Sequence, residues 1–122
     1  MKKQFKILIT DDSVLSRNKL KKTLTSFENI EISEAKDGLE ALQKISTENF
    51  DCIILDILMP NMNGIEVLHE LNKKGFKIPV IFVSADIQQT TQKKCMELGA
   101  LSVLAKPFDE PKLLQIIQTL SL

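Results

Sequence analysis

Five short runs of apolar residues, rich in Ile, Leu, Val and Phe, recur along the chain and alternate with longer stretches of helical spacing. The runs occupy residues 5–10, 30–33, 52–57, 79–84 and 102–105. Such runs predict buried strands, and their continuity favours a parallel sheet with helices on both faces. The chain is therefore interpreted as a strand followed by a helix, repeated five times.

The stretches between the runs carry the signals of amphipathic helices. In the first of them, apolar residues recur at spacings of four and three, at Leu20, Leu24 and Phe27. Asp37 and Asp109 are placed to cap helix N-termini, and Gly75 and Gly99 are placed to end helices. Because right-handed crossovers limit the topologies, we predict a doubly wound α/β fold of the flavodoxin-like (βα)5 type, with a five-stranded parallel sheet in the order 2-1-3-4-5.

Length and composition indicate one soluble domain covering residues 1–122. The chain has 16 basic and 16 acidic residues, so its charge gives no reason to expect nucleic acid or an anionic membrane as partner. Cys52 and Cys95 fit neither a disulfide framework nor a zinc knuckle, and we expect reduced core thiols. No stretch is suited to be a signal peptide or to insert into a membrane, so we expect a cytoplasmic protein.

Polar residues follow the predicted strands at their carboxyl ends. The first strand is followed by Asp11 and Asp12, the third contains Asp56 near its end, the fourth ends in Ser84 and the fifth precedes Lys106. In the predicted order the first and third strands are neighbours whose connections leave in opposite directions, so the carboxylates meet in a crevice. Three like charges there would raise one another's pKa values, and a hard divalent ion, best Mg²⁺, is the ordinary remedy.

The chemistry that these residue types support is phosphoryl transfer to a carboxylate. We expect Asp56 to be the nucleophile and Asp11 and Asp12 to hold the metal, while Lys106 and Ser84 offset charge on the phosphoryl oxygens.

Other interpretations remain open for the same residues. The acidic pair could cap a helix starting near Val14, and Asp56 could be only a metal ligand or a cap. Ser84 could be an ordinary strand-end hydroxyl, and Lys106 a solvated lysine.

Four segments in order resemble the signature of response regulator receiver domains of two-component signalling, most closely the single-domain chemotaxis type. They are the doublet Asp11-Asp12, the D-x-x-x-P-x-x-x-G segment of residues 56–64, V-S-A at 83–85 and A-K-P-F at 105–108. The resemblance covers essentially the whole chain. It implies that Asp56 accepts a phosphoryl group from a histidine kinase or phosphotransfer protein. Asp12, Asp56 and the backbone carbonyl of Leu58 would coordinate Mg²⁺, with Asp11 acting largely through water.

The resemblance also implies a signalling role that is not enzymatic, beyond assisting its own phosphorylation and slow dephosphorylation. Ser84 and Lys106 would contact the phosphoryl group, and the Lys106-Pro107 bond would be cis. The phosphorylated chain would bind a downstream effector protein or phosphatase through the face of the fourth helix, fifth strand and fifth helix. It would be a monomer or a phosphorylation-dependent dimer.

Two features bear on switching and on phosphoryl lifetime. Many relatives place an aromatic residue three positions before the lysine, where this chain has Val103. We therefore expect switching to use the loop that carries Ser84 rather than a ring rotation. Leu58 and Asp86, two residues past Asp56 and Ser84, would limit access of water and hydroxide to the acyl phosphate, which predicts slow self-dephosphorylation.

Other functions are less compatible with these residues. A haloacid dehalogenase-type phosphatase needs an aspartate two residues after the nucleophile, where Leu58 stands, and a flavin or nucleotide carrier needs a phosphate loop where DDSVLSRN is acidic. The remaining alternative is a pseudo-receiver that binds partners without phosphorylation. A chain that ends soon after the fifth helix leaves no output domain, so we expect it to act by binding another protein or by passing the phosphoryl group on.

Overall fold

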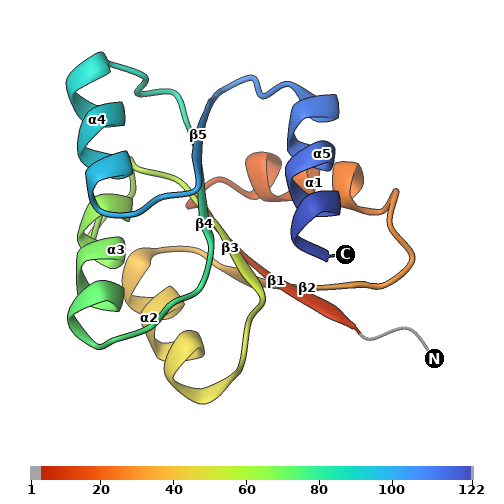
Figure 1. Ribbon diagram of the computed structural model, residues 1–122, viewed down its shortest axis with the longest axis horizontal. Helices are drawn as coiled ribbons and strands as arrows, with labels where there is room; N and C mark the ends of the chain where they lie inside the picture. Colours follow the sequence, from red (N-terminus) through yellow and green to blue (C-terminus); the bar gives the residue numbers. More distant parts are fainter. Residues whose placement is uncertain (1–3, 122) are drawn as a thin grey trace.

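The computed structural model describes residues 4–121 and confirms the predicted order of elements (Figure 1). The strands are β1 (Phe5–Thr10), β2 (Ile30–Ala35), β3 (Cys52–Leu55), β4 (Val80–Ser84) and β5 (Ser102–Ala105). The helices are α1 (Val14–Leu24), α2 (Gly38–Thr47), α3 (Gly64–Lys73), α4 (Gln89–Glu97) and α5 (Glu110–Ser121). The strands form one parallel sheet in the predicted order β2-β1-β3-β4-β5.

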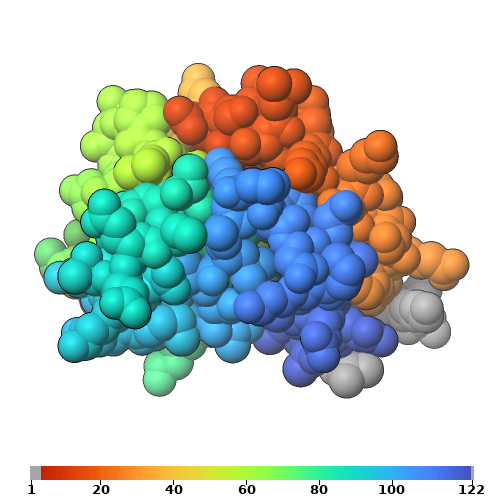
Figure 2. Space-filling view, turned by 90° about the horizontal axis from the view of Figure 1, so that it is seen from above, coloured from red at the N-terminus to blue at the C-terminus, as the bar shows by residue number. Residues whose placement is uncertain are grey.

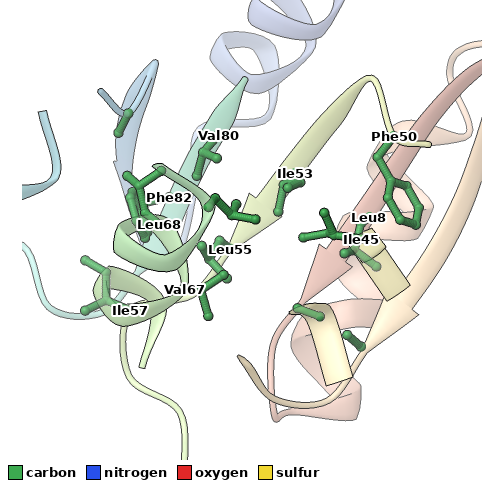
Figure 3. Close-up of a cluster of buried hydrophobic side chains, with 14 of the residues drawn as sticks. Leu8, Ile45, Phe50, Ile53, Leu55, Ile57, Val67, Leu68, Val80 and Phe82 are labelled. Carbon is green, nitrogen blue, oxygen red and sulfur yellow. The ribbon is translucent and has the colours of Figure 1, made fainter. Parts of the chain in front are cut away.

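The sheet separates two apolar layers. Figure 1 shows α2, α3 and α4 on one side of the sheet, with α1 and α5 on the other. Alternate strand residues serve the two sides, so Ile53 packs in the layer of α2 and α3 while the next residue, Ile54, packs in the layer of α1 and α5. Figure 3 shows the first layer, in which Leu8 of β1 lies near Ile45 of α2 and Leu55 of β3 lies near Val67 of α3. Each such buried side chain contributes about 1.5–3 kcal/mol through removal of apolar surface from water.

The predicted helix ends are confirmed where the sequence signals were strongest. The Asp37 side chain accepts from the backbone N–H of Glu40 at 2.8 Å at the start of α2. Asp109 does the same for Lys112 at 3.2 Å. Gly75 and Gly99 follow α3 and α4 with φ of 81° and 98°, a left-handed conformation that favours glycine.

The third strand ends earlier than its apolar run predicts, at Leu55 rather than Ile57. Asp56 N still donates to Thr10 O at 3.0 Å. The Asp56 side chain, however, accepts from the backbone N–H of Leu58 at 3.2 Å, which turns the chain out of the sheet. The strand β2 differs in the other direction and continues to Ala35, which pairs with Thr10. None of the helices formed by residues 4–121 has both the length and the apolar character needed to cross a membrane.

Candidate functional site

The carboxyl ends of the strands carry the polar side chains that the sequence predicted for the site. Asp11 and Asp12 follow β1, Asp56 follows β3, Ser84 ends β4 and Lys106 follows β5. Figure 2 looks down on the molecule of Figure 1, and the red chain after β1, the yellow-green chain after β3 and the blue chain after β5 are visible on one face.

Three carboxylates gather at this edge. Asp11, Asp12 and Asp56 each offer an oxygen, and these oxygens lie within 4.8 Å of one another. Asp11 and Asp56 are buried, with 1% and 6% of their surface exposed, whereas Asp12 is exposed. The donor set consists entirely of hard carboxylate oxygens, with one side open to water, and it therefore fits Mg²⁺ with retained water ligands.

Lys106 is the cation that faces the buried carboxylates. Its ammonium donates to Asp11 Oδ2 at 2.7 Å, to Asp56 Oδ2 at 2.9 Å and to Ser16 Oγ at 3.3 Å. Burial opposes the charged form of Lys106, but its hydrogen bonds to Asp11 and Asp56 outweigh burial and raise its pKa. The lysine is therefore charged when it faces the two aspartates.

Burial has the largest effect on the pKa of Asp11. Burial raises its pKa above the ordinary value, and the charge of Asp56 adds to this rise. The hydrogen bonds from Lys106 and from the Ser13 backbone act in the opposite direction. An anionic Asp11 therefore depends on its donors, which a cation in the cluster would supplement.

The structure does not bring every predicted residue into contact. Ser84 is 0% exposed, and its hydroxyl oxygen accepts from the backbone N–H of Asp86 at 3.2 Å. Within residues 4–121, no hydrogen bond joins the side chain of Ser84 to Asp56 or to Lys106. Leu58 contacts the site through its backbone N–H, while its side chain is 56% exposed.

The idea that the acidic pair caps the first helix is wrong. Ser13 is the N-cap of α1, and its side chain accepts from the backbone N–H of Ser16 at 3.2 Å. Asp11 instead accepts from the N–H of Ser13 itself, at 2.9 Å, in a turn before the helix.

Two site residues were missed by the sequence reasoning. Ser16 accepts from Lys106, and the Arg17 side chain donates to the backbone carbonyl of Asp11 at 2.7 Å. Side chains of a helix tilt toward its N-terminus, so residues early in α1 lie over the strand end that precedes it. The N-cap signal at Ser13 could have placed both residues in the first turns of the helix, but it does not indicate their partners.

Comparison with known proteins identifies the architecture. The sequence pattern of the response regulator receiver domain matches residues 7–118. The chain belongs to the response regulator receiver domain family. Receiver domains are the phosphoacceptor domains of two-component signalling, and they bind Mg²⁺ at an acidic cluster of the kind found here.

Curated relatives of this receiver domain are longer proteins. The protein-glutamate methylesterase/protein-glutamine glutaminase of Treponema denticola is 39% identical, in a match that covers 95% of this chain and 32% of the relative. The CpxR homolog of Haemophilus influenzae, a transcriptional regulatory protein, is 36% identical over 94% of this chain and 49% of its own length. The chain thus spans about a third to a half of these relatives.

Solved receiver domains share the fold. The CheX-CheY-BeF3-Mg complex from Borrelia burgdorferi matches with a TM-score of 0.87 and 36% identity, over 97% of this chain and 90% of that chain. The response regulator domain of Thermotoga maritima CheB matches with a TM-score of 0.86 and 32% identity, over 98% and 97%. The expected similarity to chemotaxis-type receivers is confirmed. The Lys106-Pro107 bond is cis, as expected.

Proposed function

We propose that this receiver domain takes a phosphoryl group onto Asp56 from a phosphohistidine of a histidine kinase or phosphotransfer protein. The observation that carries the proposal is the convergence at Asp56. Its Oδ2 accepts from Lys106 at 2.9 Å. One oxygen from each of Asp11, Asp12 and Asp56 lies within 4.8 Å of the other two. A buried nucleophile with a fixed cation beside it suits phosphoryl transfer, because catalysis there consists mainly of positioning and charge stabilisation.

The transfer is a single displacement at the phosphorus atom. A carboxylate oxygen of Asp56 attacks phosphorus, and the new O–P bond forms as the N–P bond of the phosphohistidine breaks. The imidazole keeps the electron pair of that bond, and its other ring nitrogen carries the proton that makes it a neutral leaving group. Lys106 lies beside the attacking carboxylate and would stabilise charge on the phosphoryl oxygens.

The metal site is proposed from the same cluster. Asp12, Asp56 and the backbone carbonyl of Leu58 would hold Mg²⁺, and Asp11 would act through water. The ion would neutralise carboxylate charge and polarise the phosphoryl oxygens. Among these groups Asp12 is the exposed carboxylate, so it is the most accessible to an arriving hydrated ion.

The response to phosphorylation is proposed to start at Ser84. Its hydroxyl oxygen accepts from the Asp86 backbone, so a turn toward the phosphoryl group would exchange that bond and move the loop before α4. Val103 is half-buried in β5 and contacts the apolar layer of α2, α3 and α4, and it has no ring to rotate. The face formed by α4, β5 and α5 would then bind an effector protein or phosphatase.

We further propose that residues 1–122 form a single receiver domain that is not itself an enzyme, in the cytoplasm, as a monomer or a phosphorylation-dependent dimer. The alternative, a pseudo-receiver that binds without phosphorylation, is disfavoured because Asp11, Asp12, Asp56 and Lys106 are all present and close together.

The decisive experiment is incubation with Mg²⁺ and acetyl phosphate, followed by intact mass. The wild type should gain one phosphoryl group, and Asp56→Asn should gain none. Omission of Mg²⁺ should abolish the gain in the wild type. An unmodified wild-type chain under conditions that label a known receiver would favour the pseudo-receiver.

A further inference from the structure

Among the described residues, the carboxylate of Asp12 has no hydrogen-bond or ion-pair partner that fixes its orientation. Its oxygen nevertheless lies within 4.8 Å of those of Asp11 and Asp56. The backbone that carries this side chain therefore sets the point from which the carboxylate extends. The peptide group between Asp11 and Asp12 decides where the carboxylate can reach.

That peptide group is held by Arg17. The guanidinium Nη1 donates to the carbonyl oxygen of Asp11 at 2.7 Å, and Nε donates to Glu34 Oε1 of β2 at 2.9 Å. The Arg17 side chain is only 15% exposed. Because a guanidinium is planar, two hydrogen bonds from different nitrogens fix its orientation, which an ammonium could not do.

Glu34 is in turn held in place. Its second oxygen, Oε2, accepts from Lys21 at 2.9 Å. The hydrogen bond from Lys21, followed by that from Arg17, lowers the pKa of Glu34 against the effect of partial burial, so Glu34 stays anionic near neutrality. The chain of contacts runs from β2 through Glu34 and Arg17 to the carbonyl of Asp11.

Local helix energetics do not explain an arginine here. Arg17 lies in the first turns of α1, which begins at Val14 and has no acidic residue in its first turn. A positive charge near a helix N-terminus is unfavourable, by roughly 0.3–1 kcal/mol, because it faces the positive end of the helix dipole. The contacts to Glu34 and to the Asp11 carbonyl offset that cost.

We propose that Arg17 is a positioning residue for the divalent cation, anchored by Glu34, and that it acts by holding the Asp11-Asp12 peptide group. This rests on the proposed function, since it assumes that Mg²⁺ binds at the acidic cluster. Arg17 does not touch the ion. It keeps the exposed carboxylate of Asp12 near those of Asp11 and Asp56.

A charge effect and a positioning effect of Arg17 predict opposite changes in Mg²⁺ affinity when Arg17 is replaced. If Arg17 acted only through its charge, removing it would take a cation away from the site and tighten Mg²⁺ binding. If Arg17 positions the peptide group, Arg17→Gln weakens Mg²⁺ binding. Substitution of residues that orient metal ligands typically costs about 10–100-fold in affinity, and we expect a loss in that range.

The measurement is a Mg²⁺ titration of the wild-type chain and its variants, without phosphodonor. The sequence has no Trp and no Tyr, so calorimetry and amide chemical shifts are the suitable readouts. Arg17→Lys keeps the charge but loses the planar pair of donors, and it should also bind Mg²⁺ more weakly than the wild type. Lys22→Gln is the matched control, because it removes a positive charge from an exposed position of the same helix but leaves the bonds of Arg17 to Glu34 and Asp11, and its affinity should match the wild type.

The Mg²⁺ affinities distinguish failure of the positioning role from failure of the proposed function. A folded Arg17→Gln variant that binds Mg²⁺ as tightly as the wild type, or more tightly, overturns the positioning role and leaves phosphorylation at Asp56 standing. Should that variant fail to fold by circular dichroism, an unchanged affinity in Arg17→Lys overturns it equally. A wild-type chain that binds no Mg²⁺ refutes both proposals.

Discussion

Lys106 Nζ donates a hydrogen bond to Asp56 Oδ2 at 2.9 Å, although the two residues are 50 positions apart in the sequence. The same ammonium reaches Asp11 Oδ2 at 2.7 Å, so one lysine serves two carboxylates that are nearly inaccessible to water. A lysine and a divalent ion placed at one acidic cluster compete for the same negative charge, and this competition can be measured.

Replacement of Lys106 by methionine should separate its two effects. Without Mg²⁺, Lys106→Met leaves two buried carboxylates without their cation and should lower the free energy of unfolding by about 2–3 kcal/mol, somewhat less than for a fully buried pair. Added Mg²⁺ should stabilise this variant more than the wild type, because the ion no longer competes with the ammonium. Urea unfolding with and without Mg²⁺ measures both effects. Lys112→Met, at an exposed position in α5, is the control for loss of a lysine charge. If Mg²⁺ stabilised Lys106→Met and the wild type equally, the proposed competition would be wrong.

The loop after Asp56 depends on Gly64, the first residue of α3. A Cβ atom at Gly64 would lie 2.1 Å from the carbonyl oxygen of Asp56 and 2.9 Å from Phe82 Cε1. Because the nearest atom is backbone, Gly64→Ala should displace Asp56 and lower the free energy of unfolding by about 3 kcal/mol or more, in the range of severe overpacking. It should also slow phosphorylation by acetyl phosphate.

The matched control is Gly75, where a Cβ would meet no atom within 4 Å but φ is 81°. Gly75→Ala should cost only about 1–2 kcal/mol, from the left-handed backbone alone, with phosphorylation unchanged. Similar losses of activity in both variants would show that the contact at Asp56 has no special effect.

Thr10 carries the one buried side-chain oxygen, among the described residues, that has no hydrogen-bond partner. Because an unpaired buried hydroxyl costs about 1–3 kcal/mol, Thr10→Val should raise the free energy of unfolding by about 1 kcal/mol. Thr23 is buried too, but its hydroxyl donates to Glu110 Oε1 at 2.7 Å, so Thr23→Val should be destabilising by a similar amount. Guanidinium unfolding of both variants measures these opposite changes in stability. A Thr10→Val variant less stable than Thr23→Val would contradict the prediction.

The two thiols should be unreactive in the native state. Cys52 and Cys95 are 0% exposed, and burial raises the pKa of both, that of Cys52 from 9.0 to about 12. Ellman's reagent at pH 8 should label neither in buffer and both in denaturant. Since the pKa of Cys52 is higher in the folded state, its thiol favours folding below about pH 9. That advantage declines as pH rises toward 12, so the stability difference between wild type and Cys52→Ala should shrink from pH 9 upward.

The lifetime of the acyl phosphate remains a prediction. Leu58 is 56% exposed beside Asp56, and the Asp86 carboxylate accepts from the Gln88 backbone at 3.3 Å. An apolar side chain and a fixed negative charge should keep water and hydroxide away from the acyl phosphate. After removal of acetyl phosphate, the phosphorylated mass should persist for minutes, and Leu58→Asn should decay faster. Loss of the label within a few seconds in the wild type would refute slow hydrolysis.

The sequence predicted the layers and helix caps because these depend on local pattern, and the strand order because right-handed crossovers leave few topologies. Continuous apolar runs define strands that are buried on both faces, and Asp37 supplies its own capping oxygen. The end of β3 was beyond such reasoning, because Asp56 binds the Leu58 backbone and turns an apolar run out of the sheet. Arg17 was missed for a related reason, since its partners Asp11 and Glu34 lie on other elements and no periodicity relates them.

The division of the core by the sheet affects how mutations combine. Ile53 and Ile54 are adjacent in sequence, yet they pack against different sets of helices. Cavities made on opposite faces share few neighbours, so their energetic costs should sum, whereas two cavities in one layer should couple. A designer could therefore stabilise the layer beneath α1 and α5 without changing how the layer of α2, α3 and α4 responds to mutation.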